Sequence, residues 1–267
     1  MTKRILALLM CLLVLAPVCS EHPWKAKRVA FLGDSITDPK NKSAKKHYWH
    51  YLQEWFGITP YVFAVSGRQW NDIPKQATQL KDKYGNNFDA IIIFIGTNDY
   101  NAGIPIGEWF KTDSAEVLAA RHKDPAMVKR LHRTPIKDKN TFRGRINIAM
   151  DSIKRMFPEK QIVLMTPLHR ASANFGKQNI QPSEDYQNSC GEWIDAYIES
   201  VKQAGNIWAV PVIDLNADSG LYPLFDEHTQ YFGDSITDRL HPNDKGHIRL
   251  AKTIWQRLSA LPCEFDN

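Results

Sequence analysis

The chain has 267 residues, of which 43% are hydrophobic and 24% are charged, a composition typical of a folded globular protein. Its formal net charge is +5, and the basic residues are scattered without a long basic run, which argues against a nucleic-acid-binding protein. No Pro-, Gly- or Ser-rich linker divides the chain, so we expect one domain with one large core.

The first twenty residues have the pattern of a signal peptide. Lys3 and Arg4 precede an apolar run over residues 5–18 that is too short to span a bilayer, and small or polar residues follow it. We therefore predict a signal peptide over residues 1–20 and a secreted or periplasmic domain over residues 21–267. We expect no stable membrane insertion once the signal is removed.

The four cysteines are divided between the signal peptide and the mature domain. Cys11 and Cys19 lie within the signal or at its border, and a lipid anchor at Cys19 is disfavoured by the poor lipoprotein cleavage site ahead of it. Cys190 and Cys263 remain in the mature domain. In an oxidising compartment these two could form a disulfide, and two unpaired thiols are the alternative.

The first predicted strand leads into a hexapeptide that occurs twice in the chain. Residues 28–32 form a short β-branched and aromatic run, which predicts a buried strand. The hexapeptide Gly-Asp-Ser-Ile-Thr-Asp follows at 33–38. Ser35 therefore lies just past the carboxyl end of a strand, where Gly33 allows a sharp exit of the chain.

Strands and helices are predicted to alternate along the rest of the chain, which indicates a parallel sheet with helices on both faces. Further strands are expected at 61–65, 90–95, 161–166 and 207–215, and helices at 47–56, 72–84, 142–157, 185–204 and after Asn243. Pro211 suggests that the last strand lies at an edge of the sheet. The pattern weakens at about 101–141, where we expect an insertion with some helix that lies over the carboxyl edge of the sheet.

Three of the predicted strands end in chemically suggestive residues. Ser35 follows the first strand, Gly67 the second and Asn98 the third, which is the most hydrophobic run of the mature chain. Ligands of parallel sheets bind at the carboxyl ends of the strands. We therefore expect these three residues to share one site.

The second copy of the hexapeptide, at 233–238, lies in a polar, irregular stretch and ends at Asp238, three residues before His241. A serine hydroxyl attacks a carbonyl only if a base accepts its proton, and a carboxylate must hold that histidine in the correct tautomer. The pattern therefore predicts Ser35 as nucleophile, His241 as base and Asp238 as its orienting partner, with Ser235 as a bystander. Backbone N–H groups of Ser35 and Gly67 and the side-chain amide of Asn98 could stabilise the oxyanion.

Other histidines offer alternatives to these assignments. Asp244 and His247 repeat the Asp-x-x-His spacing, so His247 rivals His241 as the base, although its place inside the last predicted helix favours His241. His47 and His50 could be a metal pair, but no third ligand is placed to complete a site, and a histidine pair on a helix surface is the better interpretation. We predict no metal and no cofactor.

These segments resemble the four sequence blocks of the SGNH (GDSL-like) hydrolase family, which is named for Ser, Gly, Asn and His. In chain order the matching segments are Gly33-Asp34-Ser35-Ile36-Thr37, Gly67, Gly96-Thr97-Asn98-Asp99 and Asp238-Arg239-Leu240-His241-Pro242. The resemblance implies a flavodoxin-like three-layer α/β/α sandwich with a five-stranded parallel sheet, and ester hydrolysis through an acyl-serine without a cofactor. It also implies the roles given above for Ser35, Asp238, His241, Gly67 and Asn98. The long segment after Tyr100 departs from the family pattern.

The expected function is that of an exported serine esterase acting on small-molecule or glycan esters, with carbohydrate acetyl esters as the first choice of substrate. Tyr100, Trp70 and Trp109 could stack on a sugar ring, although aromatic side chains more often belong to the core. A lysophospholipase or thioesterase is the alternative enzyme, and an inactive carbohydrate-binding relative is a third interpretation. The sequence leaves the oligomeric state open.

Overall fold

The computed structural model describes residues 22–121, 124–261 and 265. The expected signal peptide, including Cys19, lies outside these residues. Cys263 also lies outside them, so both alternatives for the exposed Cys190, a disulfide with Cys263 or two unpaired thiols, stay untested. Within the described part of the chain, no helix combines the length and the apolar character that a membrane span requires.

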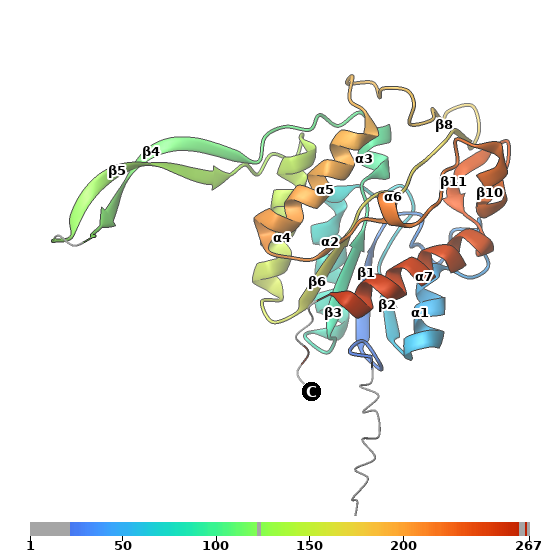
Figure 1. Ribbon diagram of the computed structural model, residues 1–267, viewed down its shortest axis with the longest axis horizontal. Helices are drawn as coiled ribbons and strands as arrows, with labels where there is room; N and C mark the ends of the chain where they lie inside the picture. Colours follow the sequence, from blue (N-terminus) through green and yellow to red (C-terminus); the bar gives the residue numbers. More distant parts are fainter. Residues whose placement is uncertain (1–21, 122–123, 262–264, 266–267) are drawn as a thin grey trace, which may run out of the picture.

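A five-stranded, all-parallel sheet forms the centre of the fold, as predicted (Figure 1). Its strands, in spatial order, are β2 (Thr59–Val62), β1 (Arg28–Gly33), β3 (Ala90–Phe94), β6 (Gln161–Met165) and β9 (Val212–Ile213). Every residue of β3 is buried, which explains its continuous apolar sequence, since a central parallel strand is covered on both faces. The strand predicted at 207–215 is reduced to β9, because its first residues belong to α5 (Ile194–Trp208), and its predicted edge position is confirmed.

Helices cover both faces of this sheet and create two cores. On one face α2 (Ile73–Tyr84), α4 (Phe142–Met156) and α5 (Ile194–Trp208) pack against alternate residues of the strands. On the other face α1 (Tyr48–Phe56) and α7 (Asp244–Ala260) pack against the remaining strand residues. The predicted layers are therefore present.

Helix α5 differs from its prediction at both ends. It begins at Ile194 rather than at residue 185, and it passes through Gly205, where we expected it to break, to end at Trp208. A Cβ atom at Gly205 would lie 2.4 Å from Val212 Cγ2. The glycine is therefore needed for close packing of α5 against β9, and does not end the helix.

Short elements build the carboxyl edge of the central sheet. Those that follow β2, β3 and β9 are the 3₁₀ helix η1 (Trp70–Asp72), α3 (Thr97–Asn101), α6 (Leu215–Asp218) and the 3₁₀ helix η2 (Asp226–Tyr231). A second small sheet has the order β10-β11-β7-β8, with bounds Phe232–Asp234, Asp238–Pro242, Ala173–Asn174 and Ile180–Gln181. Because β11 contains both Asp238 and His241, this small sheet brings the second hexapeptide to the end of β1.

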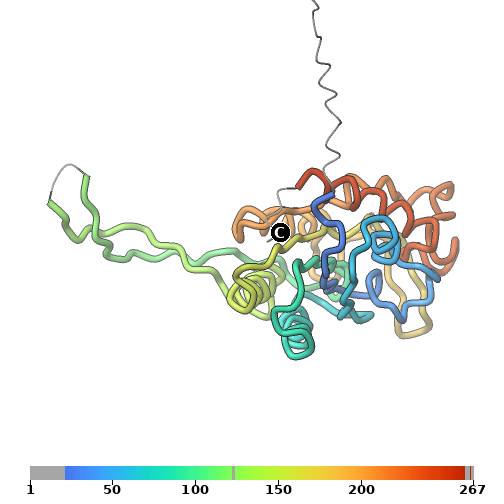
Figure 2. Tube along the Cα trace, turned by 90° about the horizontal axis from the view of Figure 1, so that it is seen from below, coloured from blue at the N-terminus to red at the C-terminus, as the bar shows by residue number. Residues whose placement is uncertain are grey.

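The expectation of helix over the carboxyl edge at residues 101–141 was wrong. The segment contains two antiparallel strands, β4 (Phe110–Ala119) and β5 (Ala126–Pro135), which form a hairpin that stands away from the body instead of helix over the carboxyl edge (Figures 1 and 2). None of its strand residues is buried, and most are exposed. Without a core-facing side, the two strands have no clear alternation of apolar and polar residues, so the pattern was not visible in the sequence.

Candidate active site

The close approach of β1 to β3 fixes the position of Ser35. A Cβ atom at Gly33 would lie 2.3 Å from the carbonyl oxygen of Phe94, so only glycine fits at the end of β1. The chain then turns through Asp34, whose carboxylate accepts the backbone N–H of Ile36 at 3.2 Å. Ser35 lies in this turn with 6% of its surface exposed.

The structure brings Ser35, His241 and Asp238 together. Nε2 of His241 lies 2.8 Å from Oγ of Ser35, and Nδ1 of His241 lies 3.0 Å from Oδ2 of Asp238. Oδ1 of Asp238 also accepts the backbone N–H groups of Leu240, at 3.2 Å, and His241, at 3.0 Å. One carboxylate therefore shapes the turn and faces the imidazole. The arrangement allows proton transfer from the serine hydroxyl to Nε2 of His241, because the Asp238 carboxylate keeps the imidazole proton on Nδ1.

The two hexapeptides fold alike but serve different purposes. In the second copy the carboxylate of Asp234 accepts the N–H of Ile236 at 2.8 Å, the same turn contact that Asp34 makes in the first. Ser235 is exposed there, and the serine that contacts the imidazole is Ser35. Asp38, the last residue of the first copy, accepts hydrogen bonds from the backbone N–H and the hydroxyl of Ser66, at 2.8 and 2.7 Å.

Gly67 and Asn98 lie with Ser35 in one cleft of about 370 Å³. The hydrogen bonds from Ser66 to Asp38 hold the loop that carries Gly67, whose φ of 78° is in the left-handed region that favours glycine. The side-chain amide of Asn98 donates one hydrogen bond to the carbonyl of Arg68, at 3.1 Å. A side-chain amide has two donors, so this contact orients Asn98 without using its full donor capacity.

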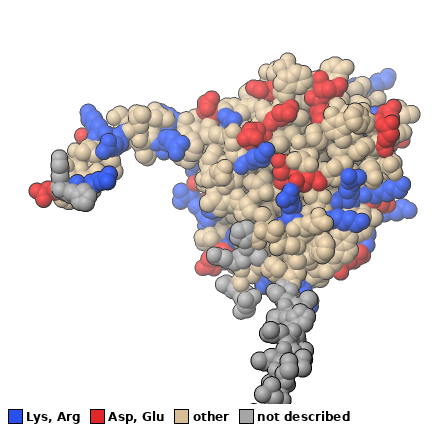
Figure 3. Space-filling view, viewed as in Figure 1, with Lys and Arg blue, Asp and Glu red and all other residues tan. Residues whose placement is uncertain are grey.

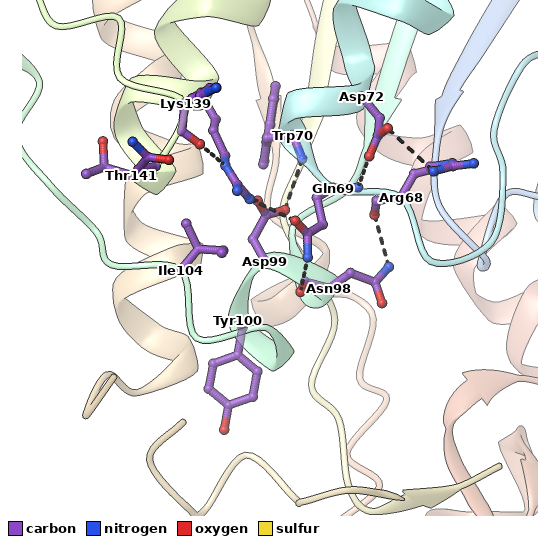
Figure 4. A network of polar contacts seen from close by, with 12 residues as sticks. Arg68, Gln69, Trp70, Asp72, Asn98, Asp99, Tyr100, Ile104, Lys139 and Thr141 are labelled. Carbon is purple, nitrogen blue, oxygen red and sulfur yellow. Dashed lines mark hydrogen bonds and ion pairs between the residues drawn. The ribbon is translucent and has the colours of Figure 1, made fainter. Parts of the chain in front are cut away.

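A buried ion pair joins the two loops that carry Gly67 and Asn98 (Figure 4). Nη1 of Arg145 donates to Oδ1 of Asp99 at 2.8 Å and to Oε1 of Gln69 at 2.8 Å. Oδ2 of Asp99 accepts the backbone N–H of Trp70 at 3.0 Å. Burial raises the pKa of Asp99 to about 6, and the charge of Arg145 opposes that rise. The sequence reasoning missed this pair, although an arginine on the apolar face of a predicted helix was a signal for a buried partner.

Two further buried groups missed by the sequence reasoning lie behind the cleft. Burial raises the pKa of Asp34 to about 7, and the charges of His241 and Arg170 oppose this rise. Arg170 is 1% exposed, and its guanidinium donates to the hydroxyl of Thr97 at 3.1 Å and to Oε1 of Gln181 at 2.7 Å. It therefore connects the start of α3 to β8.

The three aromatic residues predicted to stack on a sugar ring do not reach the cleft. Trp70, Tyr100 and Trp109 are 0%, 3% and 7% exposed and belong to the core beside α4 and α5, so this expectation was wrong. Their rings belong to the apolar layer that covers one face of the parallel sheet, since such a sheet is buried on both faces. The aromatic side chain that does line the cleft is Phe175, which is 43% exposed, with its ring centroid 5.3 Å from that of His241.

The two alternative histidines, His247 and His47, are buried beside each other, with ring centroids 4.9 Å apart. His247 is fully buried in α7 and accepts the backbone N–H of Tyr48 through Nδ1 at 3.2 Å, so the competing Asp-x-x-His pair does not form the site. Burial lowers the pKa of His247 well below its usual value. His47 is also buried rather than on a helix surface, and burial lowers its pKa to about 4. In the described ranges, no three His, Cys, Asp or Glu side chains are grouped to hold a metal ion.

Comparison with known proteins shows the family of this chain. The sequence profile of the GDSL-like Lipase/Acylhydrolase family matches residues 31–249. A solved structure of a Lactobacillus plantarum protein is 22% identical with a TM-score of 0.67, over 88% of this chain and 98% of that one.

Two other solved structures are similar over nearly the same span. A possible lipase from Chitinophaga pinensis is 20% identical with a TM-score of 0.63, over 88% of this chain and 98% of that one. A carbohydrate esterase family 3 protein from Talaromyces cellulolyticus is 17% identical with a TM-score of 0.50, over 88% and 100%. A search of curated proteins finds no match. The profile match covers most of the chain, and the chain therefore belongs to the GDSL-like lipase/acylhydrolase family.

Proposed function

We propose that this protein is a serine esterase that removes small acyl groups, above all acetyl groups, from carbohydrates. The observation that carries the proposal is the contact of 2.8 Å between Ser35 Oγ and His241 Nε2, with Asp238 on the other nitrogen of the same ring. The signal-peptide pattern of residues 1–20 supports action outside the cytoplasm, in the periplasm or in the medium.

The contacts at Ser35 support a two-step reaction. His241 accepts the hydroxyl proton as Ser35 Oγ bonds to the ester carbon, and the carbonyl oxygen gains the negative charge. The N–H groups of Ser35 and Gly67 and the amide of Asn98 stabilise that charge. His241 then protonates the leaving alcohol, which leaves an acyl-serine. Water attacks the acyl carbon, gives its proton to His241, and the acid departs as Ser35 regains its proton.

The lining of the cleft supports a hydroxyl-rich substrate. Most of its side chains are polar or charged, and its apolar members are Phe175 and Leu240. The polar members besides Ser35, His241, Asp238 and Asn98 are Asn41, Lys42, Ser43, Ser66, Asn179 and Gln181. Such groups hydrogen-bond a sugar better than they bury an alkyl chain. A lysophospholipase or thioesterase, the alternative, would need a long apolar groove.

The test compares two serines that occupy the same place in identical hexapeptides. Ser35→Ala should lower kcat on a chromogenic acetyl ester by about 10³-fold or more, because the nucleophile is lost. Ser235→Ala is the matched control and should leave kcat unchanged. Activity that survives Ser35→Ala would remove Ser35 from the reaction. If no ester is turned over by the intact protein, the inactive carbohydrate-binding relative becomes the better description.

The substrate class needs a separate measurement. Initial rates on acetyl and octanoyl esters of one alcohol, together with acetate release from an acetylated oligosaccharide, should favour the acetyl group. A preference for octanoyl esters would replace the carbohydrate esterase by the lipase-like alternative.

A further inference from the structure

The hairpin of β4 and β5, hereafter the arm, stands clear of the body (Figures 1 and 2). Each strand has ten residues, which corresponds to a length of about 33 Å. The two strands form a sheet of their own and pair only with each other within the described ranges. An isolated two-stranded hairpin is only marginally stable in water, so the arm needs support from another surface.

One face of the arm carries three of its four large exposed apolar side chains, and Val117 lies on the other face. The strand register places Leu118 opposite Met127 and Ser114 opposite Leu131, and these side chains share one face because they alternate along each strand. Leu118, Met127 and Leu131 are 65%, 58% and 80% exposed. We name this side the docking face. Large apolar side chains gathered on one exposed surface are typical of a contact with another protein.

The docking face is also basic. Lys129 and Arg133 lie on it, and Glu116, opposite Lys129, is its acidic residue. Figure 3 shows Lys and Arg side chains along the arm. A matching surface must therefore be apolar and acidic.

The body of the same chain has such a surface in residues 180–195, hereafter the acidic patch. This segment contains four Asp or Glu and no Lys or Arg. Glu184 is buried against His169, so the acidic groups that face solvent are Asp185, Glu192 and Asp195. Ile180, Tyr186 and Trp193 within it are 65%, 63% and 46% exposed. Ile180 and residues 187–189 line one hollow of about 260 Å³, so the two parts of the segment lie side by side.

We infer that the docking face of one molecule binds the acidic patch of a second copy, and that the second copy's docking face returns the same contact. The arm extends away from its own body, so its far end does not reach its own patch (Figures 1 and 2). Two reciprocal contacts related by a twofold axis close the assembly as a dimer. The docking face is about 33 Å long and about 10 Å wide, so each contact would bury about 330 Å² on each of its two surfaces. Two contacts would bury about 1,300 Å² in total, which is the size of a stable specific interface.

The first test removes the apolar contact. Sedimentation velocity of the purified chain at micromolar concentration should show a dimer for the wild type and a monomer for Leu118→Ser/Leu131→Ser. Thr112→Ala/Ser114→Ala lies on the same face of the arm, removes no large apolar group, and should stay dimeric. Thermal unfolding monitored by circular dichroism should give the same Tm for the body of both variants, since the altered residues lie outside the two cores. A monomeric wild type would overturn the inference.

The second test exchanges charges between the two surfaces. Lys129→Glu/Arg133→Glu makes the docking face acidic, and Asp185→Lys/Glu192→Lys makes the patch basic. Each double variant alone should be monomeric, because like charges then meet in both contacts. An equal mixture should form a heterodimer, because both contacts again pair opposite charges. A dimer that survives in each variant alone, or a mixture that stays monomeric, would overturn the inference; neither readout depends on esterase activity.

Discussion

Replacing Asp238 by Asn changes one atom that faces His241. Oδ1 of Asp238 accepts the backbone N–H groups of Leu240 and His241, at 3.2 and 3.0 Å, so the amide oxygen of an asparagine should keep this position. Its NH₂ group would then replace Oδ2, which lies 3.0 Å from Nδ1 of His241. Two donors cannot face each other, so the imidazole would carry its proton on Nε2. In that tautomer Nε2 cannot accept the proton of Ser35.

The size of the loss follows from the geometry. A serine hydrolase that loses the correct tautomer in this way loses about 10⁴-fold in kcat. Here Oδ1 also lies 3.1 Å from Nδ1 and can still accept its proton in part. We therefore expect a decrease in kcat of about 10²- to 10³-fold, equivalent to about 3–4 kcal/mol of transition-state stabilisation, with KM little changed.

Steady-state kinetics on a chromogenic acetyl ester would measure this decrease. Asp234→Asn is the control, because Asp234 lies in the same hexapeptide copy and its carboxylate likewise accepts a backbone N–H, that of Ile236 at 2.8 Å, while the carboxylate facing His241 is that of Asp238. It should retain wild-type kcat. If Asp238→Asn keeps kcat within a few-fold of the wild type while both variants remain folded, Asp238 does not set the tautomer.

Three further predictions concern histidine choice, pH and charge in the cleft. His241→Ala should abolish turnover. His247→Ala should keep kcat and lower the free energy of unfolding by about 2–4 kcal/mol, because it removes a fully buried side chain. Urea unfolding and steady-state kinetics measure the two effects, and a loss of kcat in His247→Ala would contradict this prediction. The pKa of Asp34 rises from 3.8 to about 7 on folding, so the native state binds the proton more tightly and stability falls as pH increases from 4 to 7. Urea unfolding of Asp34→Asn relative to the wild type should therefore show a gain that grows between pH 4 and pH 8 by up to about 4 kcal/mol, and a constant difference would refute the raised pKa. Lys42→Gln should lower the rate of hydrolysis of anionic esters about fivefold relative to that of neutral esters, because Lys42 lines the cleft. Lys40→Gln, outside the cleft, should leave the ratio of the two rates unchanged, and equal effects of the two substitutions would exclude a local role for Lys42.

Sequence patterns were sufficient to predict the central sheet and the edge at which the cleft lies. Local features were sufficient for this, because a buried parallel strand needs an unbroken apolar run such as that of β3, and a glycine or proline marks where it stops. Once the strands are parallel, their carboxyl ends must share one edge. The convergence of Ser35, Gly67 and Asn98 on one cleft was therefore predictable without coordinates, and the structure places all three there.

Residues with the same local pattern were distinguished by long-range packing alone. His241 and His247 both follow an aspartate by three residues, yet one faces Ser35 and the other is enclosed between α1 and α7. Burial also separated Phe175, in the cleft, from Trp70, in the core. Residues 110–135 gave no readable pattern, since strands exposed on both faces need no periodicity. In each case the outcome depends on which distant segments pack together, and contacts of that kind leave no signal in neighbouring residues.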